Sequence, residues 1–308
     1  MEHIDYFTEQ FQFLFHIAYR MLGSLNDAED VMQDCFIEFS KIPLEKMKSP
    51  KKLLTTILSR TAIDRYKKAK REREIYKGVW LPEPIVAEAK TNPELLFEKK
   101  ESISIALLFL LERLNPKERA AFVLRDLFDL EYQEIAEIFH WTNENTRKLV
   151  SRARSAIASE NSKYSVSKSE LETILLHFMK AIQKGNKDSL IQLLESDICL
   201  YSDGGGKVRA ALKPIFGTKK VSQFLIGLSR KPKAKKMKPI FILVNSKPAL
   251  AFFLNKEIHS ILFLEPNEKK LKKIFIWLNP DKINSLKITN PSKFDLAHIA
   301  WKLFRLKK

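Results

Sequence analysis

Apolar residues recur at helical spacing three times within the first 75 positions, which predicts a bundle of three amphipathic helices. Gly23 ends the first helix because glycine readily takes the left-handed conformation of a helix C-terminus. Ser49-Pro50 supplies an N-cap and a first position for the third. The faces predicted to be buried are Phe7, Phe11, Leu14, Phe15, Ala18 and Leu22, then Ala28, Val31, Met32, Cys35, Phe36 and Phe39, then Leu53, Leu54, Ile57, Leu58 and Ala62.

A helix-turn-helix pattern covers residues 130–158. His140-Trp141 closes the first helix, and Thr142-Asn143 can cap the second. The second helix is predicted to bury Leu149, Val150, Ala153 and Ile157, and to turn outward Asn145, Arg147, Lys148, Ser151, Arg152 and Arg154. Arginine and lysine bind guanine edges or phosphates and asparagine pairs with adenine, so this face suits a DNA major groove. A basic, solvated helix is the alternative.

Beyond residue 160 the apolar pattern is first helical and then, from about residue 198, alternating. Ser165 to Ser169 separates the two halves; a helix follows over 171–182 and ends at Gly185, and a shorter one lies around 190–194. Helices followed by strands predict an α+β domain. The strand-like runs are 198–201, 207–211, 239–244, 249–254, 259–264 and 274–278.

Charge is segregated along the 308-residue chain, whose net charge is +17. Residues 1–40 carry a net −7, residues 41–77 a net +9 and residues 161–308 a net +18. In the second helix acidic residues continue from Asp27 to Asp34, further than the helix dipole requires, which favours a docking face for a basic partner. The third helix leaves through Arg60, Arg65, Lys67, Lys68, Lys70, Arg71 and Arg73, a series suited to DNA phosphates.

The cysteines, the lack of long apolar runs and the acidic N-terminus indicate the kind of protein and where it acts. Cys35 and Cys199 lie far apart among apolar neighbours, which favours buried thiols over a disulfide or metal site. No apolar run approaches a membrane span, and the acidic N-terminus lacks a signal-peptide start, so we expect a cytoplasmic protein without membrane contact. Neither a metal nor a cofactor is expected.

Several short motifs of this chain resemble those of a known protein family. The runs 18–24 (AYRMLGS), 27–34 (DAEDVMQD) and 62–65 (AIDR) resemble region 2 of the extracytoplasmic-function (ECF) sigma factors. Residues 134–136 (EIA) and 150–154 (VSRAR) resemble region 4 of the same family. The motifs cover about half the chain in the family's order and spacing.

Three further motifs resemble the sigma-factor subgroup with a fused SnoaL-like domain, which has a cone-shaped NTF2-like fold. They are Trp80-Leu81-Pro82-Glu83-Pro84, Asp203-Gly204-Gly205-Gly206-Lys207 and Asn279-Pro280-Asp281-Lys282, the last followed by Ile283 where the subgroup usually has leucine. The predicted domains are region 2 (1–76), a linker (77–100), region 4 (101–161), the SnoaL-like domain (165–285) and a basic helical tail (286–308).

The resemblance implies an alternative sigma factor that binds core RNA polymerase and promoter DNA. Polymerase would meet Asp27, Glu29, Asp30, Gln33 and Asp34. The −10 element would be opened by Arg60, Arg65, Lys67, Lys68 and Arg71. The −35 element would be read by Thr142, Asn143, Asn145, Thr146, Arg147, Lys148, Ser151, Arg152 and Arg154. The alternative is a ligand-responsive helix-turn-helix regulator that never joins polymerase, but such a regulator needs neither the acidic face nor the strand-opening helix.

The extension is predicted to regulate in cis through its three motifs, with its positive charge either masking the acidic docking face or contacting DNA. The glycines at 204–206 lack the spacing of a phosphate-binding loop, which leaves a tight strand connection or a regulatory contact. Catalysis is not expected, since His177, His259, Asp197 and Asp203 form no acid–base pair in sequence. The concave cone leaves room for a small ligand of unknown identity.

Overall fold

The computed structural model describes residues 2–88, 103–158, 167–284 and 286. The chain forms two compact units. Unit 1 comprises residues 1–75 and 107–161, and unit 2 comprises residues 76–106 and 162–308. The described part of the predicted linker, residues 77–88, therefore belongs with the C-terminal unit. The predicted tail from Lys287 onward and part of the separator at 165–169 lie outside the described residues.

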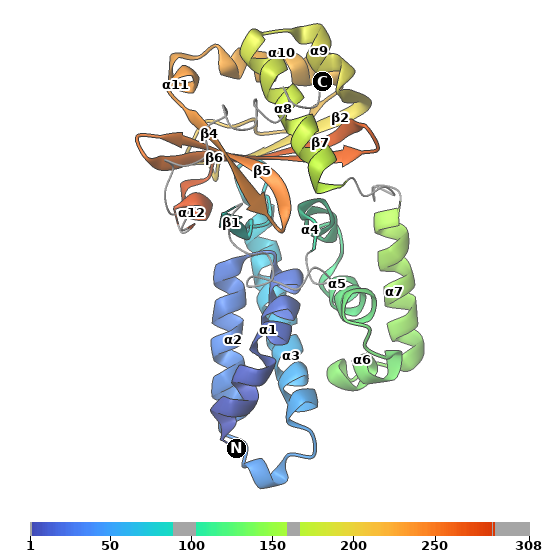
Figure 1. Cartoon of the computed structure of the whole chain (residues 1–308). Helices are drawn as coiled ribbons and strands as arrows, with labels where there is room; N and C mark the ends of the chain where they lie inside the picture. The colour runs from blue at the N-terminus through green and yellow to red at the C-terminus, as the bar shows by residue number, and fades with distance from the viewer. Residues whose placement is uncertain (1, 89–102, 159–166, 285, 287–308) are drawn as a thin grey trace. The chain divides into compact units, whose positions relative to one another are not determined.

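The N-terminal half of unit 1 is the predicted three-helix bundle (Figure 1). Gly23 closes α1 at a φ of 68°, and the side chains of Ser24 and Ser49 accept hydrogen bonds from the first turns of α2 and α3. A 3-10 turn lies between α2 and α3. The elements are α1 (His3–Leu22), α2 (Leu25–Ser40), η1 (Leu44–Lys46) and α3 (Pro50–Glu74).

Burial along α1 corrects one detail of the predicted face. Phe7, Leu14 and Leu22 are buried as predicted, whereas Phe11 is 46% exposed. Residues 16–22 are buried all round the helix, because this half of α1 packs against α2 and α3 and also meets the region 4 segment at Leu127. A one-sided stripe therefore describes only the first half of the helix.

Region 4 supplies the rest of unit 1, including a helical segment before the helix-turn-helix that the apolar pattern did not single out. An Asn115 capping box starts α5, and a π-helical turn continues it. The elements are α4 (Ile105–Leu111), α5 (Pro116–Phe122), η3 (Val123–Leu127), α6 (Tyr132–Phe139) and α7 (Asn143–Ala158). Leu149, Val150, Ala153 and Ile157 are buried, as predicted.

Unit 2 has the predicted α+β architecture, in which helices cover one face of a curved sheet (Figure 1). The sheet order is β1-β4-β5-β6-β7-β2-β3, and every neighbouring pair is antiparallel except β2 with β7. The helices are α8 (Lys168–Lys184), α9 (Lys187–Gln192), α10 (Thr218–Ser229), α11 (Pro232–Lys235) and α12 (Pro280–Ile283). The strands are β1 (Val86–Glu88), β2 (Leu194–Asp203), β3 (Ile215–Phe216), β4 (Lys238–Val244), β5 (Lys247–Leu254), β6 (Glu257–Asn267) and β7 (Lys270–Trp277).

Alternation along the strands gives the sheet two buried faces. Leu200, Leu262 and Ile276 belong to a core shared with α8 and α10. Their neighbours on the opposite face include Phe275 and Trp277, which are also fully buried. The two faces thus perform different tasks, one enclosing the core of the cone and the other receiving the linker.

Three differences from the sequence prediction concern unit 2. The strand predicted at 207–211 is absent, because the backbone N–H groups of Lys207 and Val208 both donate to the Gly204 carbonyl and make a tight turn. The helix α10 was not predicted. Strand β1 arises from the linker, which pairs with β4 at the sheet edge. Among the described residues, no helix is long and apolar enough to cross a membrane.

Candidate DNA, polymerase and linker-binding sites

The turn of the helix-turn-helix is built by residues that the sequence singled out. His140 takes a left-handed conformation at a φ of 54° and ends α6, and the ring of Trp141 stacks on Phe139 at 4.4 Å. The Thr142 hydroxyl accepts a hydrogen bond from the backbone N–H of Asn145 at 3.1 Å. The start of α7 is thereby capped and oriented, with its N-terminus accessible for a phosphate.

Six of the residues predicted to face DNA lie on the exposed surface of α7: Asn145, Arg147, Lys148, Ser151, Arg152 and Arg154. Thr146 does not. Its side chain is fully buried and its hydroxyl donates to the Thr142 carbonyl at 3.0 Å, so the prediction of a direct DNA contact by this side chain is wrong. Thr146 instead supports the first turn of the helix.

Several cations of α7 already have intramolecular partners. Arg154 forms two hydrogen bonds to the Asp126 carboxylate, at 2.8 and 2.6 Å, and this pairing raises the pKa of the guanidinium. Lys148 pairs with Glu144 at 2.6 Å, one helical turn away. The exposed Lys148–Glu144 pair is weak, so a DNA phosphate can replace Glu144 at small cost.

The basic side chains toward the C-terminus of α3 fall into two groups, those that are exposed and those that are bonded to other parts of unit 1. Lys67, Lys68 and Arg71 are exposed. Arg60 donates to the Ile138 carbonyl at 2.5 Å and lies 2.8 Å from the Nε2 atom of His140, both of which belong to the helix-turn-helix. The structure therefore places one residue that was predicted to contact the −10 element against the first helix and turn of the helix-turn-helix.

The acidic surface of α2 is present as predicted. Glu29, Asp30, Gln33 and Asp34 are all exposed. Asp27 is the exception, since it accepts hydrogen bonds from both Nε and Nη2 of Arg65 and is half-buried. This pair ties α2 to α3 and raises the pKa of the Arg65 guanidinium, first through the hydrogen bond with Asp27.

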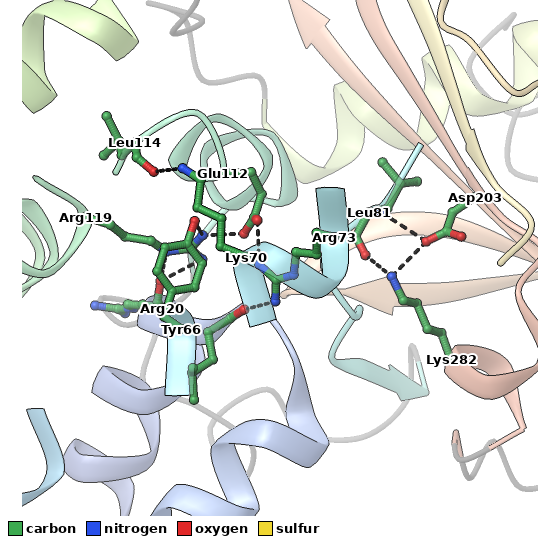
Figure 2. Close-up of polar contacts among 11 residues, drawn as sticks. Arg20, Tyr66, Lys70, Arg73, Leu81, Glu112, Leu114, Arg119, Asp203 and Lys282 are labelled. Carbon is green, nitrogen blue, oxygen red and sulfur yellow. Dashed lines mark hydrogen bonds and ion pairs between the residues drawn. The ribbon is translucent and has the colours of Figure 1, made fainter. Parts of the chain in front are cut away.

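A buried polar network joins region 2 to region 4 inside unit 1 (Figure 2). Arg119, on α5, is fully buried and donates to the Tyr66 hydroxyl at 3.0 Å and to the Arg20 carbonyl at 3.1 and 3.2 Å. It also forms an ion pair with Glu112. Glu112 in turn accepts from Arg73 of α3 at 2.5 Å. Arg119 is thus the centre of contacts from α1, α3 and the segment between α4 and α5.

The linker motif Trp80–Pro84 is bound within unit 2 by residues of the other two predicted regulatory motifs, together with Tyr76 and Trp277. We call this arrangement the linker clasp (Tyr76, Trp80–Pro84, Asp203, Trp277, Asn279 and Lys282). The fully buried Asp203 carboxylate accepts from the Leu81 N–H at 3.0 Å and the Lys282 ammonium at 2.7 Å (Figure 2). It also accepts from the Tyr76 hydroxyl at 2.5 Å. Burial, followed by the hydrogen bond to Asp203, strongly raises the pKa of Tyr76. The phenol therefore stays protonated and donates to the carboxylate.

Lys282 completes the clasp from the opposite end of the domain sequence. Its ammonium donates to the Leu81 carbonyl and lies 4.1 Å from the centre of the Trp80 ring. The indole of Trp277 donates to the Pro82 carbonyl at 2.8 Å. Backbone and side-chain groups of the linker are therefore paired with buried partners of unit 2, which makes this a specific contact.

The glycines and asparagines of the motifs shape the clasp. Gly205 has a φ of 63°, and a Cβ there would lie 2.5 Å from the Asn279 side chain. Asn279 donates to the Tyr76 hydroxyl at 3.0 Å and caps α12. Lys207 pairs with Asp281 at 2.7 Å on the surface. The triple glycine is thus a tight connection after β2 that lets Asn279 approach.

Ile85 of the linker and Ile103 just after it both bond to one further residue, Asn245, in the turn between β4 and β5. Its side chain accepts from the Ile85 N–H at 3.0 Å and donates to the Ile103 carbonyl at 3.1 Å. Its backbone N–H also donates to the Ile85 carbonyl at 2.8 Å. Positions 85 and 103 are 18 residues apart in sequence, yet one buried side chain holds both.

The fold and these sites define a DNA-binding protein with two sigma-type helical regions and a fused α+β domain. Residues 7–72 match the sigma-70 region 2 family and residues 104–157 match the sigma-70 region 4 family. The chain is 34% identical over 219 residues to the ECF RNA polymerase sigma factor SigJ of Mycobacterium tuberculosis, covering 70% of each chain. It is 26% identical to the probable ECF sigma factor SigI of the same species, over 89% of this chain and 92% of that one.

Similarity to a solved structure extends over nearly the whole molecule. The crystal structure of SigJ from Mycobacterium tuberculosis superposes with a TM-score of 0.73 at 27% identity, covering 92% of this chain and all of the other. The chain belongs to the ECF family of RNA polymerase sigma factors. A regulator that never joins polymerase is accordingly not favoured.

Residues that the motifs missed complete these sites. Arg119, Glu112, Trp277 and Asn245 had no distinguishing sequence signal, because each acts through partners remote in sequence. Tyr76 follows directly after the basic exit of α3 and was assigned only to a domain boundary. In the part of the chain that the structure describes, no cluster of three or more potential metal ligands occurs.

Proposed function

We propose that unit 2 regulates this ECF sigma factor in cis by holding both ends of the segment that connects region 2 to region 4. As a sigma factor the chain binds core RNA polymerase and directs it to promoters, and we place this action in the cytoplasm with the polymerase. The observation that carries the proposal is the pair of hydrogen bonds from Asn245 to Ile85 and Ile103.

Holding the linker limits how far regions 2 and 4 can separate. An extended chain spans up to about 3.5 Å per residue, so the 18 steps from Ile85 to Ile103 could separate their ends by about 60 Å. With both ends bonded to one side chain, that reach is lost. Two promoter elements that lie apart along a duplex require regions 2 and 4 to separate, so the held linker favours a sigma factor that is not engaged on DNA.

Contacts inside unit 1 support the same interpretation. The buried Arg119 network packs region 4 against region 2, and Arg60 of α3 bonds to the helix-turn-helix. In this arrangement Arg60 is unavailable for an unstacked promoter base. While the linker is held, regions 2 and 4 stay close together and these contacts persist. Once the linker is released, the two regions can move apart, and the contacts then break together.

The residue roles within this proposal follow the exposed surfaces. Polymerase docks on Glu29, Asp30, Gln33 and Asp34, with Asp27 positioned by Arg65. The −10 element contacts Lys67, Lys68 and Arg71, together with Arg60 once it is released, while Arg65 stays paired with Asp27. The −35 element contacts Asn145, Arg147, Lys148, Ser151, Arg152 and Arg154, with Thr142 and Asn143 at the helix start.

The role of unit 2 in this proposal is regulatory and not catalytic. Of the four candidate acid–base groups, His177 and Asp197 are exposed on the outside and Asp203 is buried in the clasp. Only His259 lines the interior cavity, and no carboxylate stands beside it among the described lining residues. A general acid–base pair inside the cone is therefore not formed by these residues.

The test compares two matched turn residues in the full-length chain. Asn245→Gly removes both side-chain bonds to the linker, whereas Asn255→Gly removes an exposed asparagine with a similar positive φ, 52° against 47°, in the neighbouring hairpin turn. Two hydrogen bonds contribute about 2 kcal/mol together, so the held state should weaken about thirtyfold relative to the released one.

Separation of the two regions is read by fluorescence energy transfer between labels at Gln12→Cys and Ser155→Cys, both exposed positions in unit 1. Burial raises the pKa of the Cys35 thiol to about 12, so this native cysteine resists labelling at neutral pH. We expect Asn245→Gly, and not Asn255→Gly, to lower transfer and to increase run-off transcription with core polymerase. Equal behaviour of the two variants in both assays would contradict the proposal.

A salt series separates this mechanism from the charge-based alternatives. If the basic extension masks the acidic α2 surface, truncation after residue 161 should increase polymerase binding most at low salt. If its lysines contact DNA, the same truncation should weaken promoter binding and flatten the salt dependence. Linker holding by Asn245 predicts an effect of Asn245→Gly that changes little with salt.

A further inference from the structure

A large cavity lies inside the cone of unit 2. Its volume is about 850 Å³, within the range of sites that bind small molecules. Its apolar wall is formed by Phe178 of α8, Leu225 of α10, Phe252 of β5 and Leu262 of β6, among others. This wall excludes a purely polar ligand, because the inner surface offers few groups that could replace lost hydration.

The charge around the cavity has a single sign. Six basic residues line it, Lys184, Arg209, Arg230, Lys231, Lys233 and Lys235, and no aspartate or glutamate occurs among its lining residues, all of which are described. Three of the six come from the short α11 and the turn before it, where the chain has no acidic residue. Such a cavity attracts one negative group and disfavours a cation.

One polar atom inside the cavity wall has no partner. The Nδ1 atom of His259 is buried and makes no hydrogen bond among the described residues. Burial and the charge of Lys233 lower the pKa of this imidazole, so it is neutral at physiological pH and can donate through either nitrogen. Since Nδ1 is closed off from the cavity, a ligand head group can meet the ring only through Nε2, which can donate a hydrogen bond to it.

We propose that the cavity binds an amphipathic carboxylate, with its apolar body against Phe178, Phe252 and Leu262 and its carboxylate between Lys233 and His259. The class includes medium-chain fatty acids and aromatic acids of similar bulk. The carboxylate gains one charge-assisted hydrogen bond from the lysine ammonium and another from the neutral imidazole. A bare inorganic anion lacks the body that the apolar wall needs.

The cavity shares its walls with the linker clasp, which gives the ligand a route to regulation. Ser202 lines the cavity while its neighbour Asp203 holds the linker, and Ile276 lines it while Trp277 bonds to Pro82. The alternation of side chains across one sheet produces this division. On α12, Ile283 likewise faces the cavity while Lys282 binds the linker. A ligand that moves this wall changes the clasp.

The direct test is a binding titration on the full-length chain with dansyl-undecanoic acid, whose fluorescence rises in an apolar site. Decanoate should displace the probe, whereas decanol should do so about tenfold less well and inorganic phosphate not at all. Lys233→Met should weaken the probe about tenfold. Lys220→Met, at an exposed position of α10 outside the cavity, should leave its affinity unchanged.

A second variant protects the test against misfolding and against binding elsewhere. Ala234→Trp places a bulky ring in the half-buried mouth formed by α11 and should abolish probe binding while the circular dichroism spectrum is retained. Retained binding in Ala234→Trp, equal displacement by decanol and decanoate, or no binding to the unmodified chain would each overturn the proposal. These readouts do not involve transcription, so they stand or fall separately from linker holding by Asn245.

Discussion

Replacing Arg119 by methionine isolates the contribution of the buried network to unit 1. Methionine keeps an unbranched chain of similar length and removes the guanidinium. The Tyr66 hydroxyl and the Arg20 carbonyl then lose these donors, and the Glu112 carboxylate keeps its ion pair with Arg73. Removing one member of a buried ion pair costs about 3–5 kcal/mol. Because Arg73 still compensates Glu112, we expect the lower end, about 3 kcal/mol.

The measurement must report unit 1 alone, because a chain of two units need not unfold in a single step. The fluorescence pair at Gln12→Cys and Ser155→Cys lies wholly within unit 1 and meets this condition. Urea unfolding of Arg119→Met is compared with Arg113→Met, a change at an exposed arginine six residues earlier. If the two variants unfold within about 0.5 kcal/mol of each other, the size of a surface effect, the network does not hold region 4 on region 2.

Three other predictions concern docking, promoter reading and pH. Reversing charge at Asp30 and Asp34 to lysine should abolish retention on core polymerase in a pull-down without changing the circular dichroism spectrum, since both side chains are exposed. Replacing Arg147 or Arg152 by alanine should cost about 1–3 kcal/mol of promoter affinity at one base position if the contact is bidentate, or weaken all sequences alike if it is to phosphate, as measured on duplexes at fixed salt. Burial, and secondly the charge of Arg20, lower the pKa of His16 from 6.5 to about 4. The unfolded chain therefore binds the proton more readily than the folded chain. The free energy of unfolding is thus highest above pH 6.5 and falls by about 3 kcal/mol in all as the pH drops toward 4. A His16→Gln variant should show a shallower loss over this window in acid unfolding.

Helix positions in unit 1 could be predicted because their signals are local. Gly23, Ser49-Pro50 and Thr142 stop or start helices through groups within four residues of themselves, and the 3.6-residue period identified the buried stripe of α7. Predictions were wrong where a residue's neighbours come from elsewhere in the fold. Phe11 has the right spacing for the core but lies in the more exposed first half of α1, and Thr146 is buried although its polarity favoured the surface.

The motifs of unit 2 show the same division. Sequence alone indicated that Trp80–Pro84, Asp203–Lys207 and Asn279–Lys282 act together, yet it did not show that the Asp203 carboxylate and the Lys282 ammonium form the contact with Leu81. The strand predicted at 207–211 was wrong because the glycine turn brings two N–H groups back to Gly204, an outcome that depends on positive φ values at Gly205 and Gly206.

The sequence by itself therefore determined the helical regions and the acidic and basic surfaces, since periodicity, capping and charge are properties of short segments. Its motifs indicated the family through their resemblance to known sigma factors. Tertiary structure alone decided that Arg119 is buried between two regions, that Asn245 holds both ends of the linker, and that the cone is lined by cations. The partners of Arg119 and Asn245 lie up to 99 and 160 residues away along the chain. The energy of such contacts depends on burial and geometry, which arise only when the whole chain has folded.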